Sequence, residues 1–106
     1  MPENKYMLRF PPKAAEDLED IYRYISEKLF AENSAIHLME RIEKSIMRLK
    51  DYPFSGSMVA DEFLKKKGYQ KLVVDNYIVF YLVNEPEKLV VVMRILYGGQ
   101  KYQEIL

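Results

Sequence analysis

Apolar residues in the first half of the chain recur with the spacing of amphipathic helices. In a first stretch they step by three, one, three and four positions, at Leu18, Ile21, Tyr22, Ile25 and Leu29. In a second stretch they recur at every third or fourth position, at Ala35, Met39, Ile42, Ile46 and Leu49. Each series lies along one side of a helix, so the pattern predicts two helices.

Local signals predict where these helices begin and end. Pro12 suits the first turn of the first helix. The acidic residues between Glu16 and Asp20 are expected to interact with the helix dipole and to face solvent rather than to bind a metal. Asn33 or Ser34 would cap the second helix, and Pro53 would end it. Because the connection is only a few residues long, we expect an antiparallel helical hairpin.

The pattern changes to that of β-strands in the second half of the chain. Three stretches rich in β-branched and aromatic residues follow one another, at 69–74, 77–83 and 89–97. Asp75 and Asn76 fit a two-residue hairpin turn between the first two, because both residues tolerate positive φ better than most. Residues 6–10 predict a further short strand, which Pro11 and Pro12 interrupt.

This order predicts an α+β domain of β-α-α-β-β-β topology that spans residues 1–106. Its antiparallel sheet of about four strands would carry the helical hairpin on one face and leave the other face open. Residues 54–60 and 65–68 are polar and predict loops. The tail from residue 100 onward fits either one helical turn or a loop.

Composition narrows the possible chemistry. The chain has no cysteine, which excludes thiol nucleophiles and cysteine-based zinc sites, and a catalytic triad would have to use its single histidine, His37. Its longest mostly apolar run, 77–83, is far shorter than the ~20 residues of a membrane helix, and residues 1–10 lack a signal-peptide pattern. We therefore expect a cytoplasmic protein with no membrane segment, metal or other cofactor.

The charges are balanced overall, at sixteen Lys/Arg and sixteen Asp/Glu. Residues 1–40 hold five basic and eight acidic side chains, and residues 41–106 hold eleven basic and eight acidic ones, so the two parts carry −3 and +3. This is a much weaker signal for binding to nucleic acid than a strongly basic domain would give.

Four short motifs follow one another along the chain. They are Asp17-Leu18-x-x-Ile21-x-x-Tyr24-Ile25, Pro53-x-Ser55-Gly56, Lys71-Leu72-Val73-Val74-x-x-Tyr77-x-Val79-Phe80-Tyr81 and Arg94-Ile95-Leu96-Tyr97-Gly98. In this order and spacing they resemble the RelE/ParE family, the toxins of bacterial type II toxin–antitoxin systems. The resemblance covers essentially the whole chain and implies a growth-inhibiting toxin that a cognate antitoxin neutralises. Members of the family either cleave mRNA on the ribosome without a metal or poison DNA gyrase.

Two positions depart from the RNA-cleaving members of the family. In those members the tyrosine of the third strand is typically followed by an arginine that holds the scissile phosphate, whereas here Tyr77 is followed by Ile78. Many members carry further arginines after the glycine that ends the last strand, whereas Gly98 is followed by Gly99 and Gln100. Both departures weaken the prediction of a nuclease.

If the chain does cleave RNA, the resemblance implies Lys71 and Arg94 as the cations that stabilise the phosphate and Tyr97 as an acid or a stacking group. Contacts with nucleic acid or with another target are expected from Lys65, Lys66, Lys67, Lys101 and Tyr102. The apolar residues expected on the open face, beside Arg94, are Ile78, Phe80 and Leu82. Such a face is better suited to an apolar segment of an antitoxin than to a phosphate.

Three functions therefore stay open. The chain is a metal-independent endoribonuclease acting on mRNA at the ribosome, a gyrase poison with no chemistry of its own, or a catalytically degenerate module that binds an antitoxin and acts as a co-repressor. The missing arginines make the gyrase-directed mode about as well supported as RNA cleavage.

Overall fold

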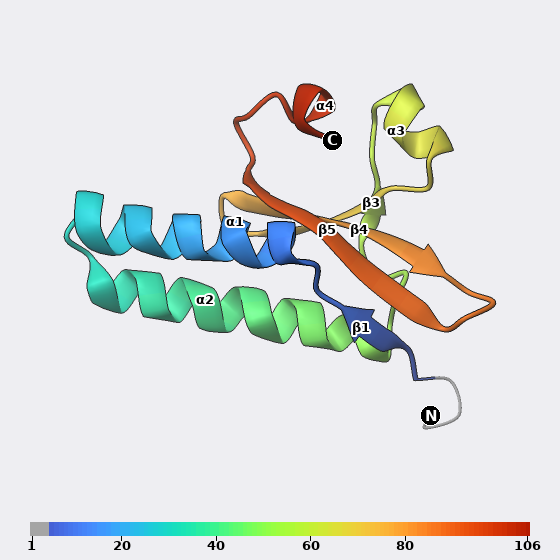
Figure 1. Cartoon of the computed structure of the whole chain (residues 1–106), viewed down its shortest axis with the longest axis horizontal. Helices are drawn as coiled ribbons and strands as arrows, with labels where there is room; N and C mark the ends of the chain where they lie inside the picture. The colour runs from blue at the N-terminus through green and yellow to red at the C-terminus, as the bar shows by residue number, and fades with distance from the viewer. Residues whose placement is uncertain (1–4) are drawn as a thin grey trace.

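The computed structural model describes residues 5–106, apart from the side chain of Gln103. In chain order the elements are β1 (Met7–Arg9), α1 (Pro12–Arg23), the π-helical turn η2 (Tyr24–Lys28), α2 (Glu32–Met47), the 3-10 turn η3 (Arg48–Lys50), β2 (Ser57–Met58), α3 (Glu62–Lys66), β3 (Gln70–Val74), β4 (Tyr77–Asn84), β5 (Leu89–Tyr97) and α4 (Tyr102–Ile105). Figure 1 shows α1 and α2 side by side as a hairpin on one side of the sheet, with α3 and α4 on the other side.

The helical hairpin forms as its apolar spacing predicts, but its second helix begins and ends earlier than expected. Helix α2 begins at Glu32 with Ala31 in the N-cap position, so neither Asn33 nor Ser34 is the cap. The reversal between the helices is made just before it, where Phe30 adopts a left-handed φ of 51°. The helical segment stops at Lys50, so the second helix ends before it reaches Pro53.

The sheet has five strands in the order β1-β5-β4-β3-β2, one more than the sequence pattern predicts. The additional strand is β2, a two-residue strand within the expected loop 54–60, which pairs with β3. The expectation of an entirely antiparallel sheet is also wrong, because β1 runs parallel to β5. The partner of a three-residue strand depends on contacts far along the chain, which a local pattern does not contain.

The side of the sheet that faces the hairpin carries the larger apolar core. Here the helices contribute residues such as Ile21 and Ile42, and the strands contribute Val79, Val92 and Ile95. The helical spacing in the sequence places the apolar side of each helix on this face of the sheet. No helix among the described residues is long and apolar enough to cross a membrane.

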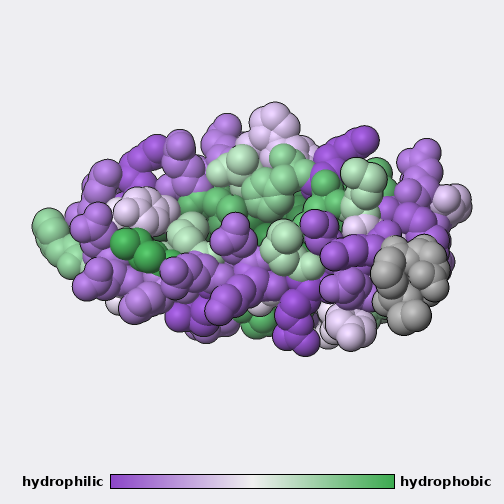
Figure 2. Space-filling model, turned by 90° about the horizontal axis from the view of Figure 1, so that it is seen from below, coloured by the Kyte–Doolittle hydropathy of each residue, from purple (hydrophilic) through white to green (hydrophobic). Residues whose placement is uncertain are grey.

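The opposite side of the sheet is not open, contrary to expectation. Leu64 of α3 and Tyr102 of α4 pack there against Phe80, which is completely buried. The loop expected at 65–68 is in part the end of α3, and the tail after residue 100 forms the single helical turn α4. Figure 2 shows the molecule from below, on the side away from α3 and α4, where hydrophobic side chains gather along the middle with hydrophilic ones around them.

Two tight features hold the sheet in register. The β3–β4 turn is made by Asp75 and Asn76 as predicted, although only Asp75 takes a positive φ, of 53°. Gly56 passes close to both β3 and β4. A Cβ at this position would collide with the Lys71 carbonyl oxygen of β3 and would lie 2.6 Å from the Tyr81 Oη of β4. The Gly56 N–H donates to that oxygen over 3.1 Å, so the loop before β2 is fastened to the middle of β4.

Candidate functional site

A groove of about 660 Å³ lies between α1 and the C-terminal end of β5. Its lining comes from α1, η2, β4, β5 and the loop after β5, and consists of Asp17, Asp20, Ile21, Tyr24, Tyr77, Arg94, Ile95, Leu96, Tyr97 and Gln100. Two of the predicted site residues, Arg94 and Tyr97, are among them. The groove therefore contains two of the three residues that were predicted to act on RNA.

The floor of the groove is held by an ion pair between α1 and β5. The Arg94 Nε donates to the Asp17 Oδ2 over 2.7 Å, and a second guanidinium nitrogen donates to the Oδ1 over 2.9 Å. Side-chain exposure is only 18% for Arg94 and 8% for Asp17. Bonding to Asp17 raises the pKa of Arg94 above its ordinary value, against the opposing effect of burial. The charge of Arg94 is thus compensated within the chain.

Asp17 also completes the edge of the sheet. Strand β1 pairs with β5 only as far as Arg9 and Val91, so the next part of β5 has no strand on its edge away from β4. Helix α1 packs there instead, and the Asp17 Oδ2 accepts a hydrogen bond of 2.9 Å from the Ile95 N–H. A buried backbone N–H needs an acceptor, so this carboxylate replaces the missing strand.

Three tyrosines form the outer part of the groove. The Tyr77 and Tyr97 rings lie edge to face, with centroids 5.9 Å apart and planes 69° apart. Burial is the main cause that raises the pKa of Tyr77, and its neighbours Tyr24 and Tyr97 raise it further. The Tyr97 N–H donates to the Gln100 Oε1 over 3.1 Å, so the loop after β5 folds back against this aromatic cluster.

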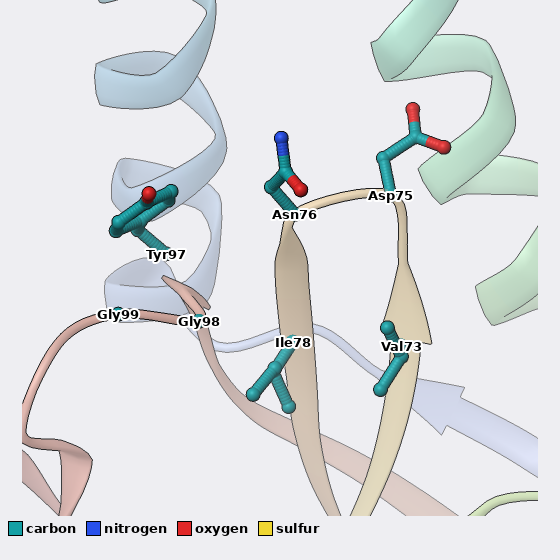
Figure 3. Close-up of a pocket in the computed structure, with 7 residues that line it drawn as sticks. All are labelled: Val73, Asp75, Asn76, Ile78, Tyr97, Gly98 and Gly99. Carbon is teal, nitrogen blue, oxygen red and sulfur yellow. The ribbon is translucent and has the colours of Figure 1, made fainter.

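A smaller pocket of about 220 Å³ adjoins the groove at Tyr97, beside the β3–β4 turn. Figure 3 shows that Ile78 and Val73 project to one side of the sheet, while Tyr97, Asn76 and Asp75 project to the other side, toward the helices. Gly99 passes directly beneath the Tyr97 ring, where a Cβ would lie 2.6 Å from a ring carbon. None of the seven described residues that line this pocket carries a positive charge.

The structure does not bring together the three residues predicted to act on RNA. Lys71, Phe80 and Arg94 lie opposite one another on β3, β4 and β5, so a fully buried phenylalanine separates the two cations. Met93 is an extra residue in β5 between the pairs Phe80–Arg94 and Tyr81–Val92. Next to this bulge, Arg94 bonds to α1 instead of lying free on the opposite face, where it was expected.

The predicted target-binding residues lie on the α3 and α4 side of the sheet. Lys65 and Lys66 belong to α3, Lys67 ends it, and Lys101 precedes α4; all four are exposed. The Lys67 Nζ lies 4.4 Å from the centroid of the Phe63 ring. The side chain of Tyr102 is less available, because its ring packs on Phe80 with centroids 4.9 Å apart.

The three residues predicted to bind an antitoxin do share one side of β4, as strand alternation predicts. Only Ile78 and Leu82 keep part of their surface exposed, while Phe80 is covered by Tyr102 of α4. The expectation that Phe80 lies on an open surface is therefore wrong. The sequence pattern missed this because it did not define the fold of the tail that covers the face.

Sequence reasoning also missed the role of Asp17, which was assigned to the helix dipole and the solvent. A signal was present, because Asp17 lies between Ala14 and Ile21 at helical spacing, within the apolar stripe of α1. An arginine in an apolar strand, such as Arg94, needs a partner of this kind.

Within the described part of the chain, no group of three or more His, Cys, Asp or Glu side chains could hold a metal ion.

The chain is similar to known proteins in sequence and in fold. The family model of the ParE toxin of the type II toxin–antitoxin system, parDE, matches residues 8–102. Among solved structures, the chromosomal ParDE TA system from P. aeruginosa matches with a TM-score of 0.71 and 19% identity, over 89% of this chain and 97% of that chain. The toxin–antitoxin complex RelBE2 from Mycobacterium tuberculosis matches with a TM-score of 0.59 and 19% identity, over 88% of this chain and 98% of that chain. No curated protein matches.

Proposed function

Because this chain belongs to the ParE toxin family of type II toxin–antitoxin systems, we propose that it inhibits growth by binding and poisoning DNA gyrase rather than by cleaving mRNA. In this proposal the toxin acts in the cytoplasm, performs no chemistry of its own and is neutralised by a cognate antitoxin. Membership confirms the family predicted from the four sequence motifs, and the two solved structures confirm the predicted α+β class.

The observation that carries the proposal is the ion pair between Arg94 and Asp17. RNA cleavage without a metal requires uncompensated cations that stabilise the charge developing on the phosphate. Arg94 instead donates two hydrogen bonds to a carboxylate on a neighbouring helix. A phosphate at this position would face the Asp17 carboxylate as well as the guanidinium, so its binding would be opposed.

The adjoining pocket supports the same conclusion. At the position that carries a phosphate-holding arginine in the RNA-cleaving members, this chain has the apolar side chain of Ile78. The single charged residue among the described lining residues is Asp75, which is acidic and is itself paired with Arg41. Among the residues that the structure describes, neither the groove nor the pocket therefore offers a free cation to a phosphate.

The exposed lysines provide a surface for a macromolecular target. Lys65, Lys66, Lys67 and Lys101 flank α3 and α4, on the side of the sheet away from the helical hairpin. A cluster of exposed positive charge attracts an acidic protein surface or DNA and raises the rate of association. We assign these lysines to contact with the gyrase–DNA complex, together with Lys71 of β3, which lies opposite Phe80 on the same side of the sheet.

The antitoxin is proposed as the second partner. The two solved structures described above are a toxin–antitoxin system and a toxin–antitoxin complex, and each matched chain is covered almost completely by this one. Ile78 and Leu82 offer the partly exposed apolar surface on β4 that an extended or helical segment of an antitoxin can cover.

Expression of the chain alone from a tightly repressed promoter tests the proposal. We expect cells to filament and stop dividing, while incorporation of labelled methionine stays normal during the first minutes after induction. With purified gyrase and supercoiled plasmid, the protein should increase the amount of cleaved DNA held by the enzyme. A prompt fall in methionine incorporation would instead establish mRNA cleavage, and normal growth would establish a disarmed binding module.

Two variants sharpen the result. Replacement of Lys65, Lys66 and Lys67 by alanine should reduce gyrase-dependent DNA cleavage at least tenfold, because it removes three charges from the proposed contact surface. Lys44→Ala is the matched control, since Lys44 is an exposed lysine of α2 on the hairpin side. If the triple variant and the control cleave as much DNA as the wild type, the lysine surface does not contact gyrase.

A further inference from the structure

The groove between α1 and β5 has a charge and shape that suit a cation. Its lining contains Asp17, Asp20 and a single base, Arg94, so the net charge of the lining is −1. Arg94 is already satisfied by Asp17. Its volume of about 660 Å³ lies within the ~300–1,000 Å³ of sites that hold a small ligand, so it can accept a long side chain.

Asp20 is the acid that remains available to a partner. Its side chain is 62% exposed, and its contact with Arg23 is a long one of 3.5 Å. Arg23 bonds at a shorter distance, 3.0 Å, to Glu19. An incoming cation could therefore pair with Asp20 while Arg23 keeps its bond to Glu19.

The tyrosines supply the second half of a cation site. Tyr77 and Tyr97 stand nearly perpendicular to each other, and Tyr24 lines the same groove from η2. Tyr24 and Tyr97 are about half exposed, so they are accessible to a bound group. Aromatic rings arranged in this way attract cations through the negative charge on their faces, and the attraction is strongest where water is excluded.

We propose that this groove binds an arginine side chain of the antitoxin, with the guanidinium stacked among Tyr24, Tyr77 and Tyr97 and paired with Asp20. Arginine fits better than lysine, because its planar guanidinium stacks on a ring and donates to a carboxylate at the same time. This proposal rests on the proposed function, from which the antitoxin is taken.

The antitoxin is the expected source because the groove continues into the surface assigned to it. Tyr97 lines both the groove and the small pocket that contains Ile78. Ile78 and Tyr97 project to opposite sides of the sheet, but both line this pocket at its end. A segment that covers Ile78 can therefore turn around the β3–β4 end of the sheet and place one side chain in the groove. The lysines assigned to gyrase lie instead around α3 and α4.

The chemistry of the groove can be tested without any antitoxin. We would titrate the isotope-labelled chain with N-acetyl-arginine amide and follow its amide resonances by NMR, with N-acetyl-citrulline amide as the neutral probe of similar shape. We expect saturable shifts at Tyr24, Tyr97 and Gln100 with the arginine probe only. Absence of these shifts, or equal shifts with citrulline, would overturn the proposal.

Asp20→Asn should weaken binding of the arginine probe at least threefold, because it removes the exposed charge and keeps the size of the side chain. Glu43→Gln is the matched control, since Glu43 is an exposed acid of α2 that does not line the groove. Circular dichroism would confirm that both variants are folded. Equal loss of binding in both variants would mean that only the overall charge matters, which would contradict a defined site.

The source of the side chain is tested with the antitoxin encoded beside the toxin gene. We expect Asp20→Asn to weaken its affinity at least tenfold, measured by calorimetry, and Glu43→Gln to leave it unchanged. Unchanged affinity in Asp20→Asn would remove the antitoxin as the source. The proposed function is tested independently of the groove. It is wrong if the wild-type chain affects neither growth nor gyrase, whatever the result with the arginine probe.

Discussion

Asp17 and Arg94 lie 77 positions apart in the chain and form a nearly buried ion pair that fastens α1 to β5. The same carboxylate accepts the Ile95 N–H at the point where β1 no longer pairs with β5. The Asp17 side chain thus satisfies a backbone N–H at the edge of the sheet, and it neutralises the positive charge of the arginine that was expected to hold a phosphate. The stability of the fold and the absence of a free cation in the groove have the same structural cause.

Asp17→Asn should lower the free energy of unfolding by about 2–4 kcal/mol, because it leaves the guanidinium of Arg94 partly buried without a countercharge. Urea unfolding monitored by circular dichroism measures the change. Glu19→Gln is the control, because Glu19 belongs to an exposed pair on the same helix and its loss should cost less than about 1 kcal/mol. Equal effects of the two substitutions would show that Asp17 has no special role.

Gly56→Ala should destabilise the chain by about 1–3 kcal/mol, because the added methyl group collides with the Lys71 carbonyl and the Tyr81 hydroxyl. Thermal unfolding of the variant would show this as a lower Tm. The neighbouring Ser55 is exposed, so Ser55→Ala should leave the Tm nearly unchanged. A Gly56→Ala variant as stable as the wild type would mean that the loop before β2 shifts easily.

Phe80→Ala should cost about 3–5 kcal/mol, because the ring is completely buried and its loss leaves a cavity beneath Tyr102. Phe63 provides a matched control, since the same substitution removes a ring that is 64% exposed. Phe63→Ala should change the free energy of unfolding by less than about 1 kcal/mol. If both cost the same, α3 and α4 do not cover the sheet in solution.

Alkaline pH should destabilise the protein through Tyr77 and Tyr81. Burial is the main cause that raises both pKa values above 10.0, although the hydrogen bond from the Gly56 N–H partly opposes it at Tyr81. The stabilisation is complete below the pKa of the unfolded chain, near 10.0, and is lost as pH rises through the higher values of the folded state. Urea unfolding between pH 8 and 11 should therefore show declining stability above about pH 10.

Tyr81→Phe should reduce the loss of stability at alkaline pH, because the substitution removes one of the two buried phenols, Tyr77 and Tyr81, that cause it. At neutral pH the same variant should lose about 1–3 kcal/mol, since the Gly56 N–H and the Gln70 side chain lose their bonds to the Tyr81 hydroxyl. A decline above pH 10 that is identical in the variant and the wild type would contradict a role for Tyr81.

Elements whose signal is local could be predicted from the amino-acid sequence. The apolar stripes of α1 and α2 predict the hairpin, and the alternation along β4 correctly assigns Ile78, Phe80 and Leu82 to one side of the sheet. These properties follow from the 3.6-residue and two-residue periods of the backbone, which any window of the chain already contains.

Features that depend on distant residues are set by the packing of the folded chain. The parallel pairing of β1 with β5, the cover that α4 places over Phe80, and the bond between Asp17 and Arg94 each join segments far apart in the chain. Periodicity places Asp17 in the apolar stripe of α1 but does not identify the residue that it bonds to. Its partner is set by the packing of α1 against the unpaired edge of β5, so the character of the groove could not be predicted from periodicity.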